Sequence, residues 1–129
     1  ASTDLGGGLA FTVALADRLA TMKGVTLTVD AGEPVTVEVR PFVLENLLWF
    51  CLQQLFTAAG SGTTVALAAE AEGATALVRV RCAAGTEVNA AATEVERAGQ
   101  PLLAELQAQL NVAPAGDALL LRLPVRRVG

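Results

Sequence analysis

The chain has 129 residues, of which 53% are hydrophobic and 17% are charged, and this composition predicts one globular domain rather than a disordered chain. It contains no histidine, so the usual general base and the commonest zinc ligand are both excluded within the chain. The formal net charge of -4 argues against a nucleic-acid partner, because duplex binding needs Lys and Arg clustered on one face.

The two cysteines, Cys51 and Cys82, lie in apolar sequence without a CxxC spacing. This pattern predicts buried, reduced thiols in a cytoplasmic domain, and a disulfide between them is the alternative. The most hydrophobic stretch, residues 44–56, is interrupted by polar side chains and is shorter than the roughly 20 apolar residues of a membrane span. The first residues contain neither an initiator Met nor a signal-peptide pattern, so we expect residues 1–129 to be a single domain cut from a longer protein or processed.

The N-terminal third predicts a helix followed by two strands. Thr3 and Asp4 can cap a helix that runs to about Met22, and Gly24 predicts its end. Residues 25–29 and 35–39 each alternate apolar and polar side chains with a period of two. A short segment with Gly and Pro separates them, which predicts a β-hairpin.

The rest of the chain predicts two more helices and three more strands. A helix begins at Pro41, carries leucines at three- and four-residue spacing, and ends at residues 60–62. The remaining expectations are a hairpin of strands 64–69 and 75–82 with Gly73 in its turn, a loop over 83–92, a helix over 94–110 and a strand over 118–123. This order predicts an α+β fold, a two-layer sandwich in which three helices cover one face of a mixed, mostly antiparallel sheet of about five strands.

Several segments, taken in order, resemble the ATP-binding catalytic domain of sensor histidine kinases and its superfamily of gyrase, Hsp90 and MutL ATPases. The resemblance covers nearly the whole chain. The segments that carry it are residues 23–30, which resemble a "GVtLtvd" strand, residues 40–48, 61–67 and 76–82, and the ending at 118–125, which resembles "f.l.LPv". The resemblance implies the histidine-kinase-like ATPase fold and a bacterial two-component signalling context.

The resemblance also implies a nucleotide site, and here the sequence departs from the family. Family members carry two polar side chains, four residues apart on one helix, that hold Mg²⁺ or the catalytic water and the phosphates. Aligning the apolar positions places Phe50 and Gln54 there. Because a phenyl ring cannot coordinate a cation, we expect no magnesium and no other metal at these positions.

Two glycine boxes of the family depart as well. The first begins with an Asp that accepts a hydrogen bond from adenine, and Cys82 stands in its place, with Gly85 as the remaining glycine. The second opens the last helix, where backbone amides hold phosphates, but this chain has Gly99 followed closely by Pro101, which has no N–H. The interval between the two glycines is also too short for a full nucleotide lid. The expected vestigial cleft therefore consists of Phe50, Gln54, Cys82, Gly85 and Gly99.

Three aromatic residues, Trp49, Phe50 and Phe56, lie on or beside the apolar face of the second helix. We expect them to fill the core or the old cleft, and an exposed dimerisation or partner-docking patch is the alternative. The carboxylates are scattered without the pairing that acid–base chemistry needs, so no catalytic residue is expected.

These observations predict a non-catalytic pseudokinase domain that binds no cofactor and acts as a signalling interaction or dimerisation module. The resemblance implies a response regulator, a true kinase or a second copy of the chain as protein partner, in the cytoplasm and without nucleic acid or membrane contact by this chain. One alternative is a histidine kinase catalytic domain that binds ATP and Mg²⁺ with atypical motifs. Another is a small-molecule sensor that uses an apolar cleft lined by Phe50, Gln54 and Cys82.

Overall fold

The computed structural model describes residues 3–30, 32, 34–83 and 86–125, so the position expected for Gly85 lies outside the described residues. Its elements, in chain order, are β1 (Thr3–Asp4), α1 (Leu5–Met22), β2 (Thr26–Asp30), β3 (Thr36–Val37), α2 (Pro41–Ala58), β4 (Thr64–Glu72), β5 (Thr75–Arg81), α3 (Val88–Ala98), α4 (Gln100–Leu106), β6 (Gln109–Val112) and β7 (Ala118–Pro124).

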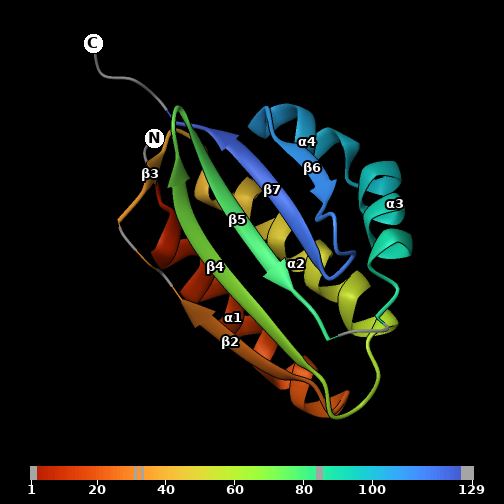
Figure 1. The fold of residues 1–129 in the computed structure, drawn as a ribbon. Helices are drawn as coiled ribbons and strands as arrows, with labels where there is room; N and C mark the ends of the chain where they lie inside the picture. Colours follow the sequence, from red (N-terminus) through yellow and green to blue (C-terminus); the bar gives the residue numbers. More distant parts are fainter. Residues whose placement is uncertain (1–2, 31, 33, 84–85, 126–129) are drawn as a thin grey trace.

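Five strands form one mixed sheet in the order β2-β4-β5-β7-β6 (Figure 1). β2 runs parallel to β4, and the other three pairs are antiparallel. The helices pack against one face of this sheet, with α1 and α2 behind it in Figure 1. The α+β sandwich with a mostly antiparallel five-stranded sheet is therefore confirmed.

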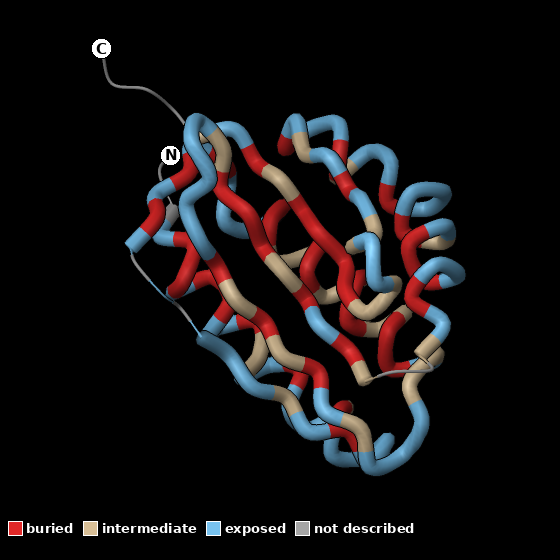
Figure 2. Tube along the Cα trace, viewed as in Figure 1, coloured by how far each residue is buried: buried red, intermediate tan, exposed pale blue. Residues whose placement is uncertain are grey.

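The core lies between the sheet and the helices because each element has one apolar side. Along β4, the side chains of Val65, Leu67 and Ala69 are buried and alternate with more exposed neighbours. Figure 2 shows the same contrast along α1 and α2, whose buried residues recur at helical spacing while other residues of each turn face solvent. One continuous cluster joins these residues, so the sheet and helices form a single hydrophobic core.

The opposite face of the sheet carries a smaller buried cluster of Leu77, Ala118 and Leu120. Leu77 is only 1% exposed, although none of the helices in the described part of the chain lies on this face. On neighbouring strands, Glu70 and Arg122 stand directly beside it in the register. Long charged side chains can bury an apolar neighbour beneath their methylene groups, and this accounts for the burial of Leu77.

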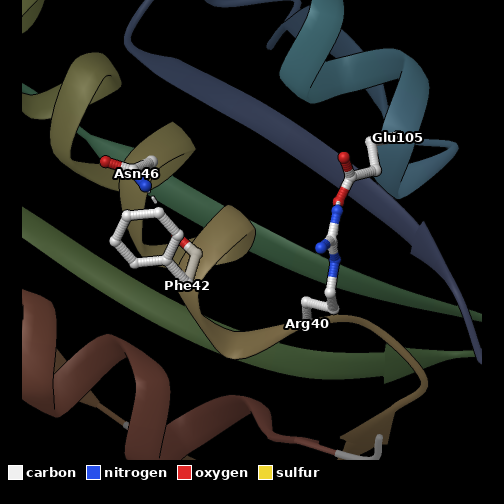
Figure 3. Close-up of polar contacts among 4 residues, drawn as sticks. All are labelled: Arg40, Phe42, Asn46 and Glu105. Atoms are coloured by element: carbon white, nitrogen blue, oxygen red, sulfur yellow. Dashed lines mark hydrogen bonds and ion pairs between the residues drawn. The ribbon is translucent and has the colours of Figure 1, made fainter.

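Both long helices begin where the sequence predicts. Asp4 caps α1, since its carboxylate accepts a hydrogen bond from the amide of Gly7 at 3.1 Å. Pro41 opens α2, where its missing N–H costs nothing. The preceding residue, Arg40, extends to α4, and its Nε donates to Glu105 at 3.0 Å (Figure 3).

The predicted hairpin of residues 25–29 and 35–39 is wrong. β2 pairs in parallel with β4, and β3 pairs instead with β1 in a separate two-stranded sheet. The parallel pairing is possible because α2 crosses over between β2 and β4. The alternation of apolar and polar side chains predicts strands but does not identify their partners. The hairpin was predicted because only a short segment separates the two strands.

The predicted loop over 83–92 and the single helix over 94–110 are also partly wrong. A helix already starts at Val88, and it breaks after Ala98 before α4 starts at Gln100. α4 ends at Gln107, which adopts a left-handed conformation with φ of 53°. Leu110 consequently lies in β6, a strand that the sequence analysis did not predict.

Both cysteines are buried and free, as expected, and no helix in the described ranges is long and apolar enough to cross a membrane.

Candidate functional site

The expected nucleotide cleft lies where α2 packs against α3 and α4, and Phe50 and Gly99 meet there. Phe50 is half-buried and packs against the core. Gly99, which is buried, joins α3 to α4. A Cβ built on Gly99 would lie 3.4 Å from Cδ2 of Phe50 and 2.6 Å from the carbonyl oxygen of Val95. The phenyl ring is thus in van der Waals reach of the residue that would open a phosphate-binding loop.

Gln54 lies one helical turn after Phe50 on α2 and is half-buried. Its amide would be the polar group at this end of the cleft. An amide alone cannot replace the anionic ligand that Mg²⁺ prefers. The pair therefore presents one ring and one neutral amide.

The N-terminus of α4 offers little to a phosphate. The helix has only seven residues, and Pro101 occupies its first turn. The first three amides of a helix are normally free to hold an anion, and Pro101 removes one of them. The backbone amide of Leu103 is not free for a phosphate, because it donates the first hydrogen bond of the helix to the carbonyl of Gly99 at 3.0 Å.

Cys82 directly follows β5 and is 5% exposed. Its amide donates to the carbonyl of Asp117 at 2.8 Å. Burial raises the pKa of the Cys82 thiol to about 11, with a smaller contribution from the negative charge of Asp117. A neutral thiol is a weak acceptor and cannot stand in for the carboxylate that reads adenine.

Cys82 also lines a shallow hollow of about 430 Å³, but the cleft expected for a small-molecule sensor is not assembled around it. Neither Phe50 nor Gln54 is among its lining residues, which are Gly62, Thr63, Thr64, Ala66, Arg81, Cys82 and Ala83. The structure thus brings Phe50 and Gly99 together and leaves Cys82 in a different hollow.

The chemistry of the junction can be judged from these groups. A magnesium nucleotide needs carboxylate or amide oxygens for the cation, free backbone amides for the phosphates and an acceptor for the base. The junction provides a phenyl ring, a single neutral amide and a proline-interrupted helix start, and the neutral thiol of Cys82 lies in a separate hollow. These residues do not fit a magnesium nucleotide. Within the described part of the chain, no three His, Cys, Asp or Glu side chains come close enough to hold a metal ion.

The aromatic residues divide between core and surface. Phe56 is 2% exposed and belongs to the core, as expected, whereas Trp49 is only partly buried at the core's margin.

A larger hollow of about 560 Å³ lies elsewhere, between the outer sides of α1 and α2. Its lining residues are Phe11, Thr12, Leu15, Phe42, Glu45, Asn46 and Trp49. The sequence analysis named Trp49 as a possible surface patch but missed Phe11, Leu15 and Phe42. A signal was present, because Phe11 and Leu15 lie on the side of their helix away from the buried stripe.

No protein-family model matches the sequence, and no curated protein does. Solved structures do match. The catalytic domain of histidine kinase ThkA, in a nucleotide-free form, superposes with a TM-score of 0.77 at 12% identity, over 96% of this chain and 95% of that chain. The ATP-binding domain of PrrB from Mycobacterium tuberculosis gives 0.77 at 18% identity, over 98% of each chain.

A histidine kinase from Burkholderia phymatum gives a TM-score of 0.64 at 21% identity, over all of this chain and 71% of that chain. At these identities the likeness establishes the fold. The chain has the fold of histidine-kinase catalytic domains, as the resemblance in its sequence implies.

Proposed function

We propose that this chain is a non-catalytic domain with the histidine-kinase fold, which binds no nucleotide and acts by contacting another protein. The observation that carries the proposal is the position of the Phe50 ring beside the junction of α3 and α4, so close to Gly99 that a Cβ built there would lie 3.4 Å from the ring. In the histidine-kinase domains that the sequence resembles, the residues at these two positions hold Mg²⁺ and the phosphates. Fold alone does not establish function, so the proposal rests on the chemistry of these side chains.

Two further observations support it independently. Pro101 removes an amide from the start of α4, and a neutral Cys82 stands where the base-reading carboxylate would be. The three departures fall at three positions that the resemblance assigns to nucleotide binding, and each removes a group that the nucleotide would need. The proposal therefore places the function of the chain at its surface.

The proposed setting is a bacterial two-component pathway in the cytoplasm, where the partner is a response regulator, a kinase or a second copy of the chain. These assignments rest on the solved structures that share the fold, which are histidine kinases. Because the chain has no histidine, any phosphotransfer would have to use a histidine outside it.

Calorimetric titration with ATP and ADP, with and without Mg²⁺, tests the proposal. At a protein concentration that detects dissociation constants up to about 1 mM, where binding is worth about 4 kcal/mol, we expect no saturable heat. Gln54→Ala and its neighbour Gln53→Ala form a matched pair for the opposite outcome. Saturable heat that Mg²⁺ strengthens, and that Gln54→Ala abolishes while Gln53→Ala preserves it, would establish the ATP-binding alternative.

A further inference from the structure

The groove between α1 and α2 lies in an exposed apolar surface on the outer side of the helix layer. Phe11 is 52% exposed, Leu15 is 58% exposed and Phe42 is 75% exposed. Met22, one turn beyond Arg18 on α1, is 77% exposed. Large side chains of this kind seldom gather at the surface of a protein that works alone. We call the surface of Phe11, Leu15, Arg18, Met22, Phe42, Glu45, Asn46 and Trp49 the α1/α2 face.

The spacing of these residues makes the face regular. Phe11, Leu15, Arg18 and Met22 follow one another at intervals of four, three and four residues, so they form one stripe along α1. On α2, Phe42, Asn46 and Trp49 continue the same spacing. The core covers the opposite sides of both helices, and within the described residues no element lies over these stripes.

The two helices run side by side in the same direction. α1 follows β1 directly and α2 begins shortly after β3, and β1 and β3 pair with each other, so both helices start at the same end of the fold. The groove between them is therefore a trough between two helices that run in the same general direction. Such a trough accepts the side chains of another helix in the manner of a helical bundle.

The α1/α2 face carries two charged side chains of opposite sign. Arg18 lies on the α1 stripe, and Glu45 lies in the groove on α2. Among the described residues, neither side chain has an ion-pair or hydrogen-bond partner. The face thus carries one unpaired positive and one unpaired negative side chain, on different helices.

We propose that the α1/α2 face binds a second copy of this chain, with α1 of one copy lying over α2 of the other. A twofold axis perpendicular to the helices makes the two contacts identical and reverses the partner's helices, so that Arg18 near the end of α1 in one copy is set against Glu45 near the start of α2 in the other. The exposed Leu15 and Phe42 of one copy then enter the groove of the other. This inference rests on the proposed interaction role and names the partner for it.

Sedimentation velocity over a concentration series, together with the fluorescence of Trp49, tests the proposal directly. Trp49 is the chain's single tryptophan and lines the groove, so its emission should shift to shorter wavelength as the dimer forms. Leu15→Glu should weaken the dimer by more than about tenfold, because it places a charge in the apolar contact. Ala10→Glu, an exposed position on the same helix outside the α1/α2 face, should leave the dimer unchanged.

Charge reversal separates this arrangement from general stickiness. Arg18→Glu and Glu45→Arg should each weaken the dimer, and the double variant should restore it, because the pairing is reciprocal. Thermal unfolding of each variant checks that the fold is intact.

A chain that stays monomeric at every concentration would overturn the proposal, and so would a dimer insensitive to Leu15→Glu or one that the double reversal does not restore. A monomer whose Trp49 emission responds only to an added amphipathic helical peptide would reassign the groove to another protein, and would likewise overturn it. None of these results touches nucleotide binding, which calorimetry measures separately.

Discussion

The packing of α2 against the junction of α3 and α4 makes a quantitative prediction at Gly99. Gly99→Ala places a methyl group 2.6 Å from the carbonyl oxygen of Val95 and 3.4 Å from the Phe50 ring. The ring contact is close to ordinary, but the approach to the carbonyl is not one that real Cβ atoms make. That carbonyl also accepts the 2.7 Å hydrogen bond from the amide of Gly99 that ends α3. Relief of the clash must therefore move backbone.

The cost can be worked out from three contributions. Overpacking of this kind costs about 1–3 kcal/mol. A weakened hydrogen bond at the end of α3 adds up to about 1 kcal/mol. Replacing glycine restricts the unfolded chain and offsets about 0.4–1 kcal/mol. Taken at their midpoints, these contributions lower the free energy of unfolding of Gly99→Ala by about 2 kcal/mol.

Urea unfolding followed by circular dichroism measures this change, and Gly60→Ala is the matched control. Gly60 is exposed, and a Cβ there would meet nothing within 4 Å. Gly60→Ala should leave stability unchanged or raise it slightly. If the two variants had equal stability, the close approach of Gly99 to the Val95 carbonyl at the end of α3 would be refuted.

Three other perturbations have defined outcomes. Asp4→Ala removes the cap of α1 and should cost about 1 kcal/mol in urea unfolding, whereas Asp4→Asn should retain most of it. Burial raises the pKa of Cys51 to about 12 and that of Cys82 to about 11, so both thiols should resist a thiol reagent at mildly alkaline pH until urea is added; rapid reaction of the native protein would contradict their burial. The hydrogen bond from Arg122 lowers the pKa of Glu72, so its stabilisation is present at neutral pH and lost as the pH falls through that lowered pKa. Glu72→Gln should reduce the loss of stability in acid, and an unchanged acid profile would show that this pair contributes nothing.

Much of the fold could be predicted because its local signals are strong. The cap at Asp4, the Pro41 start of α2 and the turn at Gly73 each place an element boundary to within a few residues. The pairing of the strands could not be predicted in the same way. β2 pairs with β4, and the connection between them runs through α2; the alternation of side chains along β2 does not show which strand lies beside it. The short β6 was missed because Leu110 continues the helical spacing of α4, and only the left-handed turn at Gln107 ends the helix.

The residues of the candidate site could be named from the sequence, but their arrangement in space could not. Sequence spacing placed Phe50 and Gln54 on one side of α2, and the structure puts Phe50 against Gly99. The sequence spacing did not predict that Cys82 lines a different hollow, because the position of Cys82 depends on how the segment after β5 leaves the sheet. The groove beside Trp49 lies on the outer side of the helices, and none of the positions that the resemblance assigns to the nucleotide site lines it, so the resemblance did not predict it.

The most direct test of the central claim, that the nucleotide site is lost, is an NMR titration of the labelled chain with ATP and Mg²⁺. Amide signals report each residue separately, so weak binding at the old cleft can be told apart from binding elsewhere. The account predicts that the amide chemical shifts of Phe50, Gln54, Cys82 and Gly99 do not change at millimolar nucleotide. Saturable shifts at these four amides, increased by Mg²⁺, would contradict it.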